Sequence, residues 1–434
     1  MRAIPVLLAA LLMFAAVGVG TPATHGHADR VSATGDPGES NAATSEHNAT
    51  GTLRVLGLNG SEDVTAEVDV VPIDAGMATD FGANASARRI ETIALRDRIE
   101  GANTSDERQR RILDGLNEVE KDVITLHSER RTAIAAYSAG ETTARQLLVT
   151  LAELRAEAVV LDDRAQLLGR LAEETPDFTL GDDRVTQLEF DLRTFDGPVR
   201  SRTAAALAGE RGASTRVYVA ATESGVTLAT VTDGEYVRET FREDLRNRDQ
   251  GGVDELAAQN VTVRSYPEIS AAAEGGVATI GSGGTYISSL QYGNGSLTAF
   301  VDGGSERVFM EHQRVRLAGI ETGPSVTRTL DLTLRVNRTF PGGPLRVEVV
   351  DPRTGEPVDA VVKIQPDDGA STEVGSTGAD GVLWTVSPQT GFVVTVVEVG
   401  STDVSFRGVD PVEPTTVADT FGGGNASASI ATDD

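Results

Sequence analysis

The 434-residue chain contains no cysteine, only two lysines and few aromatic residues. Without cysteine it forms neither disulfides nor thiolate metal sites, and it cannot carry a lipid-modified cysteine. Neither Lys121 nor Lys363 follows a glycine, which excludes the Gly-Lys pair of a phosphate-binding loop. The H-E-x-x-H motif of zinc proteases and the G-x-S-x-G motif of serine hydrolases are also absent. The chain therefore lacks the common catalytic signatures.

Positive charge is scarce: the chain has 38 basic and 65 acidic residues, which gives a net charge of -27. This excess of negative charge makes nucleic acid an unfavourable partner. High acidity, almost no lysine and little aromatic content resemble the proteins of extremely halophilic archaea. At molar salt the Debye length shrinks to about 3 Å, so repulsion among surface carboxylates is screened. The alternative is an acidic, partly disordered protein of an ordinary habitat.

Long hydrophobic runs are limited to one, at 4–20, which Arg2 precedes. A basic residue before such a run is typical of a secretory signal. Cleavage after Ala28 or near Gly20, or retention as an anchor, is compatible with the pattern. We therefore expect 1–28 to be a signal peptide or N-terminal anchor, and the protein to be extracellular or at the cell surface. Residues 411–434 form an expected flexible tail without a hydrophobic anchor.

Asparagine is the most informative residue type, because eight of the eleven asparagines stand in N-x-[S/T] sequons. Chance would give roughly two, so the excess indicates N-glycosylation outside the cell. We expect Asn260 and Asn337, in strand-like stretches, to be modified less readily than sequons in the linker, turns or tail (Asn48, Asn59, Asn294 and Asn425). The eight candidates are Asn48, Asn59, Asn84, Asn103, Asn260, Asn294, Asn337 and Asn425.

The N-terminal third begins with a linker and a short β segment. Residues 29–50 are small, polar and acidic, which predicts a disordered linker. Two strand-like stretches at 53–58 and 64–71 flank Asn59-Gly60, a dipeptide suited to a tight turn. This pattern predicts a β-hairpin over 51–86.

Residues 87–175 are predicted to form an antiparallel helical hairpin. Thr104 with Glu107, and Thr143 with Gln146, are capping boxes at the start of two helices. Steps of three and four place the apolar residues of each helix on one stripe. A short loop favours intramolecular pairing over dimerisation. The two stripes are Ile112, Leu116, Val119, Val123, Leu126, Ile134 and Tyr137, and Leu147, Leu151, Leu154, Ala158, Leu161, Ala165, Leu168 and Ala172.

Residues 176–323 are expected to form an α+β domain. A helix is predicted at 197–209, strands at 216–221 and 226–231, and a hairpin between 297–301 and 307–309. A G-x-L-x-x-x-V-D-G stretch at 295–303, preceded by a helix, resembles the PepSY-type modules of exported proteins. That resemblance implies a binding module that restrains a protease or senses a ligand.

Residues 324–410 carry short β-branched strands separated by Gly, Pro and Asp, which predicts an immunoglobulin-like β-sandwich. The order of strand, D-x-x-T-G-E-P-V, strand, T-x-x-D-G and strand resembles carboxypeptidase-regulatory-like and immunoglobulin-like modules, which implies a scaffolding or adhesive role. Together with the turn at 133–140, the whole chain resembles a group of uncharacterised exported haloarchaeal proteins.

Candidate catalytic and metal-binding residues are few. His25, His27 and His47 lie in the predicted linker, His127 is expected to be solvated, and His312 is expected in a strand with no nearby nucleophile. The acidic pairs Asp162-Asp163, Asp182-Asp183 and Asp367-Asp368 are interpreted as solvated surface rather than as the acid and base of a glycosidase. No catalytic, cofactor or metal residue is assigned.

The expected fold class is multidomain α and β, with a helical hairpin, a central α+β region and a C-terminal β-sandwich. The expected function is a non-enzymatic, N-glycosylated surface or secreted protein of a high-salt environment. An exported PepSY-like regulator and a carboxylate-dependent hydrolase are the alternatives. Its expected partners are envelope or extracellular proteins, with self-association through the helical hairpin as an option. The membrane is expected to be contacted only through a retained N-terminal segment.

Overall fold

The computed structural model describes residues 54–58, 65–71, 75–181, 183–209, 215–248, 252–320, 323–337, 339–367 and 369–417. The predicted signal or anchor, the predicted linker and most of the predicted tail lie outside these residues. So do His25, His27, His47, Asn48, Asn59 and Asn425. The described part consists of helices followed by antiparallel sheets, which confirms the multidomain α and β class.

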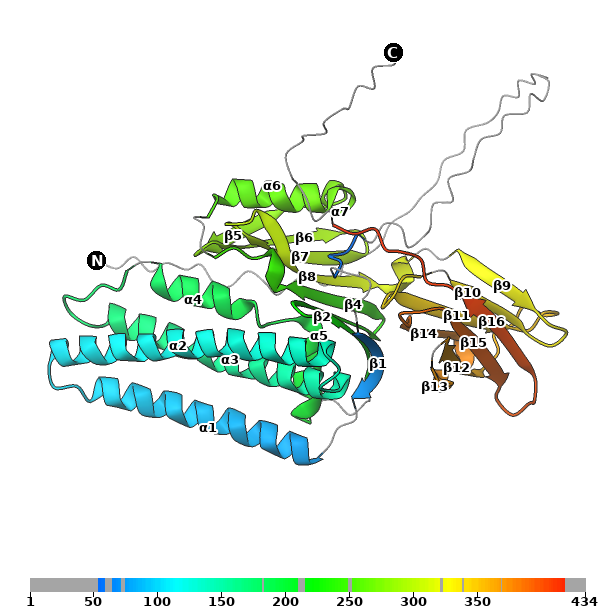
Figure 1. Ribbon diagram of the computed structural model, residues 1–434, viewed down its shortest axis with the longest axis horizontal. Helices are drawn as coiled ribbons and strands as arrows, with labels where there is room; N and C mark the ends of the chain where they lie inside the picture. The colour runs from blue at the N-terminus through cyan, green and yellow to red at the C-terminus, as the bar shows by residue number, and fades with distance from the viewer. Residues whose placement is uncertain are drawn as a thin grey trace, which may run out of the picture. The chain divides into compact units, whose positions relative to one another are not determined.

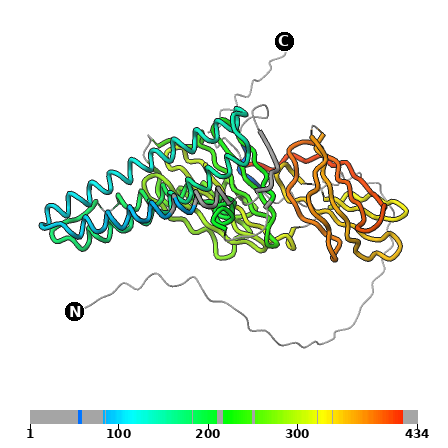
Figure 2. Tube along the Cα trace, turned by 90° about the horizontal axis from the view of Figure 1, so that it is seen from below, coloured from blue at the N-terminus to red at the C-terminus, as the bar shows by residue number. Residues whose placement is uncertain are grey.

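Three long helices run side by side: α1 (Ala75–Glu100), α2 (Ser105–Ser138) and α3 (Ala144–Glu173) (Figures 1 and 2). The predicted stripes of α2 and α3 are buried at every position. The predicted intramolecular hairpin is therefore confirmed, but α1 packs on it as a third helix. A Cβ added at Gly115 would lie 3.0 Å from Leu168 and 3.5 Å from Leu95, so a glycine there lets α1, α2 and α3 approach closely.

The two predicted caps form, in different ways. At α3, Thr143 accepts a hydrogen bond from Gln146 N, and the Gln146 side chain accepts one from Thr143 N, which completes a capping box. At α2, Thr104 accepts from Glu107 N, whereas the Glu107 carboxylate bonds Asn103 N, one residue before the cap. Both arrangements satisfy amide groups that a helix start leaves without a partner.

An eight-stranded antiparallel sheet follows, in the order β1-β2-β3-β4-β8-β7-β6-β5. The hairpin predicted over 51–86 is wrong: residues 65–71 form a strand, but this strand pairs with β2, and the helix α1 begins at Ala75. The other predicted strands and the 297–309 hairpin are confirmed. The strands are β1 (Thr65–Val71), β2 (Thr215–Thr222), β3 (Gly225–Thr232), β4 (Glu235–Arg242), β5 (Ala278–Ser282), β6 (Thr285–Tyr292), β7 (Gly295–Asp302) and β8 (Arg307–Arg316).

Helices cover both faces of this sheet (Figure 1). On one face lie the three long helices with α4 (Arg184–Arg193) and α5 (Pro198–Leu207), and on the other lie α6 (Glu255–Ser265) and α7 (Pro267–Ala271). The central strands β4 and β8 place Glu239 opposite His312 and Thr240 opposite Glu311. Successive residues point to opposite faces, so Glu239 reaches α5 and Glu311 reaches Tyr266, which lies between α6 and α7.

The C-terminal region is a β-sandwich of two four-stranded sheets, β14-β11-β10-β9 and β13-β12-β15-β16, as predicted. Its core is formed by the alternate residues that both sheets turn inward, such as Val347, Val362 and Val394. The strands are β9 (Pro324–Arg328), β10 (Thr333–Asn337), β11 (Pro344–Val350), β12 (Ala360–Pro366), β13 (Thr372–Ser376), β14 (Val382–Val386), β15 (Phe392–Glu398) and β16 (Val404–Val409).

Two extended segments from distant parts of the chain, 54–58 and 415–417, pair in parallel; we call them the clasp. Val55 N donates to Thr415 O at 2.9 Å, and Val417 N donates to Val55 O at 2.9 Å. Val55 and Leu56 are fully buried. The chain therefore returns, after the sandwich, to the segment with which its described part begins.

Candidate functional site

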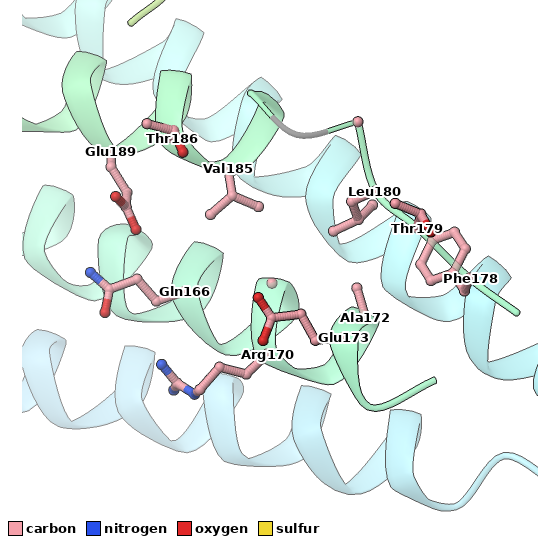
Figure 3. A pocket seen from close by; sticks show the side chains of 12 residues that line it. Gln166, Arg170, Ala172, Glu173, Phe178, Thr179, Leu180, Val185, Thr186 and Glu189 are labelled. Carbon is pink, nitrogen blue, oxygen red and sulfur yellow. The ribbon is translucent and has the colours of Figure 1, made fainter. Parts of the chain in front are cut away.

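A cavity lies between the C-terminal half of α3, the loop that follows it, and α4 (Figure 3). Its volume is about 590 Å³, within the range of small-molecule sites. The cavity is lined by Gln166, Gly169, Arg170, Ala172, Glu173, Phe178, Thr179, Leu180, Gly181, Val185, Thr186 and Glu189. We call it the α3–α4 pocket.

The walls of the pocket differ in chemistry. Phe178, Leu180 and Val185 are half-buried and pack on the main core, so one side is apolar. On the other side, the side chains of Gln166 and Glu189 end near one another (Figure 3). Within the described residues, the carboxylates of Glu173 and Glu189 have no hydrogen bond or ion pair. The pocket thus combines an apolar wall with unpaired acidic groups.

Asp162 stands behind this acidic side, one turn of α3 before Gln166. Its Oδ2 accepts a hydrogen bond from Gln166 Nε2 at 3.0 Å, and its Oδ1 is buried without a hydrogen-bond partner among the described residues. Burial, with the charge of Glu189, raises the pKa of Asp162 to about 6. The expectation that the Asp162-Asp163 pair is solvated surface therefore holds for the exposed Asp163 and is wrong for Asp162.

A second, smaller pocket of about 230 Å³ surrounds His312 on β8, where a strand was predicted. Asp196 is the one acidic residue in its lining, and Arg155 binds it at 2.8 Å. Burial lowers the pKa of His312 to about 3, so the ring is neutral at ordinary pH. A glycosidase site needs two carboxyl groups, one on each side of the bond that it cleaves, and the described lining of this pocket supplies one.

His127 is buried, so its expected solvation is wrong. One side of helix α2 packs against α3, and a second side packs against α4 and β2. The His127 ring is buried on this second side. Arg130 donates to His127 Nδ1 at 3.0 Å, which leaves the proton on Nε2, 3.1 Å from Asp191 Oδ2. Burial lowers the pKa of His127 to about 4. The cluster holds α2 against α4. Phe195 contacts the His127 ring at a tilted angle, and the Arg130 guanidinium lies over the Phe195 ring.

Two buried ion pairs join the central strands to their neighbours. Arg200 on α5 binds Glu239 Oε1 at 2.7 Å, and the other oxygen of this carboxylate accepts from Val199 N at 2.9 Å. On the opposite face Arg238 binds Glu311, whose Oε2 also accepts from Tyr266 Oη at 2.6 Å. All of these charged groups have partners, which is the usual condition for buried charge in a structural role.

The clasp lies on the same network. Arg238 donates to Leu56 O at 3.1 Å, Gln313 donates to Arg54 O at 2.8 Å, and Arg242 donates to Gly57 O at 3.1 Å. Buried side chains of the sheet thus satisfy the backbone carbonyls of an extended segment, as buried polar groups require.

The described sequons differ in accessibility. Asn103 is exposed before α2, and Asn260 is exposed on α6, so the strand expected at Asn260 is wrong. Asn294 lies in the β6–β7 turn and donates to Gly319 O at 2.8 Å. Asn337 ends β10, as expected, and is buried: it donates to Pro344 O and accepts from Arg346 N at 2.6 Å. Asn84 lies in α1.

Two other kinds of site are not found among the described residues. None of their helices is both long and apolar enough to cross a bilayer. Nor do three or more of their histidine, aspartate and glutamate side chains gather as ligands for a metal ion.

Three family models match successive parts of the chain. Residues 1–212 are similar to a domain of unknown function (DUF7096), and residues 217–321 to a family of unknown function (DUF7094). Residues 325–406 are similar to the archaeal fibronectin-III type-like domain, which agrees with the β-sandwich seen there. Neither a curated protein nor a solved structure matches the chain. Along its length the chain is thus similar to two regions of unknown function and then to an archaeal fibronectin-III type-like domain.

Proposed function

We propose that this protein is an exported, N-glycosylated, non-enzymatic protein of the cell surface or extracellular space, adapted to high salt, whose C-terminal sandwich makes protein contacts. The signal-like N-terminus, the eight sequons and the acidic, lysine-poor composition support export into a saline environment. Similarity to the fibronectin-III-like domain supports a role in protein interaction, which is a fold-level analogy.

The observation that carries the interaction role is an exposed apolar strip on the sandwich. On β16, Phe406 is 68% exposed and Val404 is 47% exposed. Both share a sheet face with Val397, because Val404 pairs directly with Val397 and Phe406 with Thr395. Aromatic side chains on a surface are typical anchors of protein interfaces. We define Val397, Val404 and Phe406 as the β16 strip.

Substitution in the β16 strip tests this role. The chain with Phe406→Ser would be compared with one carrying Ile124→Ser, since Ile124 on α2 is 70% exposed and lies outside the sandwich. After cross-linking on intact cells, we expect the Phe406 variant to lose its cross-linked envelope or extracellular proteins and the Ile124 variant to retain them. Equal cross-linking by both variants would contradict the role of the strip.

The alternatives have less support. The pocket at His312 has one acidic group in its described lining, so the two-carboxylate hydrolase lacks a geometric basis there. The PepSY-type resemblance rests on its short motif, and the match to residues 217–321 is a family of unknown function. A regulator of that type stays a prediction.

A further inference from the structure

The α3–α4 pocket has walls that are held in place by the chain itself. Ser105 donates to Pro176 O at 3.0 Å, and Thr175 donates to Leu171 O at 2.6 Å, which fixes the start of the loop. At its far end Arg184 donates to Glu120 at 2.6 Å and to Asn117 at 2.7 Å. The loop is therefore anchored to α2 on both sides, so contacts within the chain hold the walls of the pocket. Such preorganisation lowers the entropic cost of binding.

The polar side of the pocket offers acceptors. Glu173 and Glu189 contribute carboxylate oxygens without hydrogen-bond or ion-pair partners among the described residues. Because Gln166 Nε2 is engaged by Asp162, the oxygen of the Gln166 amide remains as a further acceptor. Arg170 is the one cationic residue of the lining, so acidic groups outnumber it. This set calls for a ligand that donates hydrogen bonds and carries positive charge.

A primary ammonium fits these acceptors, because it carries three donors and no acceptor. A bare metal ion fits less well, since the described residues contain no group of three or more metal-ligating histidine, aspartate or glutamate side chains. The facing wall of Phe178, Leu180 and Val185 adds apolar surface, so the favoured ligand also has an aliphatic or aromatic part.

We propose that the α3–α4 pocket binds an amphipathic amine, with its ammonium at Glu189 and Gln166 and its apolar part against Phe178 and Leu180. The site does not depend on the proposed role of the β16 strip, which lies in a different domain. Free amines and the lysine side chains of peptides share this chemistry.

The test uses the full chain in one fixed salt concentration and three probes followed by ligand-observed NMR. Phenethylamine has both required features, 2-phenylethanol lacks the charge, and methylamine lacks the apolar part. We expect phenethylamine to bind, and each of the other two to bind roughly 10-fold more weakly or not at all. Absence of phenethylamine binding, or equal binding by either control, would overturn the proposal.

Variants locate the binding. Glu189→Gln should weaken phenethylamine binding roughly 10-fold, whereas Glu118→Gln, the same change at an exposed position of α2, should leave it unchanged. Gly169→Leu should abolish it, because even a Cβ at this position would lie 3.6 Å from Val185 and the longer side chain would fill the pocket. Equal effects of the Glu189 and Glu118 variants would place the amine elsewhere.

Two readouts remain decisive if a variant is unstable. In the unsubstituted chain, phenethylamine should slow hydrogen exchange in peptides spanning 166–189, and unchanged exchange there would contradict the site. Affinity should also fall as pH drops through about 6, because Asp162 then loses its charge while the amine keeps its own. The groups that set this titration are Glu189 and Arg193 on α4 and Asp163 on α3. A flat profile in this pH range would count against the assignment.

Discussion

The buried pair of Arg238 and Glu311 provides the sharpest test of how the central sheet is held together. The Glu311 side chain is fully buried and that of Arg238 is 6% exposed. Besides the guanidinium, the carboxylate accepts from Tyr266 Oη at 2.6 Å and from Gln313 Nε2 at 3.2 Å. Glu311→Gln keeps the shape of the side chain and removes its charge, which takes from the buried Arg238 cation the counter-ion that it has among the described residues.

The expected cost follows from the burial of the pair. Removing one partner of a buried ion pair typically lowers the free energy of unfolding by about 3–5 kcal/mol, because the remaining charge stays buried and unpaired. The matched control is Glu100→Gln, which breaks the exposed Arg96–Glu100 pair of α1. Solvent screens an exposed pair of this kind, so it contributes little to the free energy of unfolding. The double variant Arg238→Gln/Glu311→Gln should lose less than the sum of the single losses, since the two groups interact directly.

The assay is urea denaturation at one fixed molar salt concentration. Circular dichroism follows the helices, and fluorescence follows Trp384 on β14, which packs against the cluster of Tyr236 and Phe340. The Glu311 variant should unfold at clearly lower urea by circular dichroism, and the Glu100 variant should match the unsubstituted chain. A loss below about 1 kcal/mol for Glu311→Gln would refute the view that this pair anchors the sheet.

Three further outcomes are expected. Leu154→Asp places an unpaired carboxylate among buried residues of α3, which should lower the free energy of unfolding of the full chain by several kcal/mol and therefore its melting temperature. An unchanged melting temperature would refute the stripe assignment. His127 and His312 are buried as neutral rings, with pKa values of about 4 and about 3 against 6.5 when unfolded. Because the unfolded chain binds these protons first, stability should fall as pH drops below about 6.5, while the raised pKa of Asp162 acts in the opposite direction between about 6 and 3.8. A pH titration of the melting temperature measures the sum, and replacing either histidine by glutamine should reduce the loss. Lowering the salt from molar to about 0.01 M lengthens the Debye screening length from about 3 Å to about 30 Å, so a chain of net charge -27 should melt at a lower temperature. Sulfate should protect the fold better than chloride. A melting temperature that does not change across the salt series would remove the halophilic interpretation.

Local patterns predicted the two helices of the hairpin, α2 and α3, well. Every residue of the two stripes, from Ile112 to Ala172, is buried, because steps of three and four force one face of a helix toward its neighbour whatever that neighbour is. The strands of the sandwich were predictable for the same reason, since alternation along a strand is a local signal.

Long-range pairing was not predictable. The strand predicted at 64–71 forms at 65–71, but Asn59-Gly60 suggested that it pairs with 53–58, whereas β1 pairs with residues 215–221. Nothing in the sequence marks which distant strand completes a sheet, and the β4–β8 pairing in its centre has the same character. The third helix of the bundle was partly missed because the apolar stripe of α1 is weak.

The candidate site was missed because burial of polar residues depends on tertiary packing. Asp162 and Asp163 look identical in sequence, yet Asp163 is exposed, whereas Asp162 is half-buried beside Glu189 of α4 and its pKa is raised. His127 was assigned to solvent because a two-helix hairpin would leave it exposed; the sheet and α4 cover that side of α2. One signal was available: the polar residues 162, 166, 170 and 173 follow one another at helical spacing along α3.

The central claim, that the protein is exported and glycosylated, is tested most directly by glycopeptide mass spectrometry of the chain purified from the outside of its native host cells. The account predicts glycans on the exposed Asn103 and Asn260, and an unmodified Asn337, whose amide is buried and hydrogen-bonded to Pro344 O. A chain found inside the cell with every sequon unmodified would contradict it.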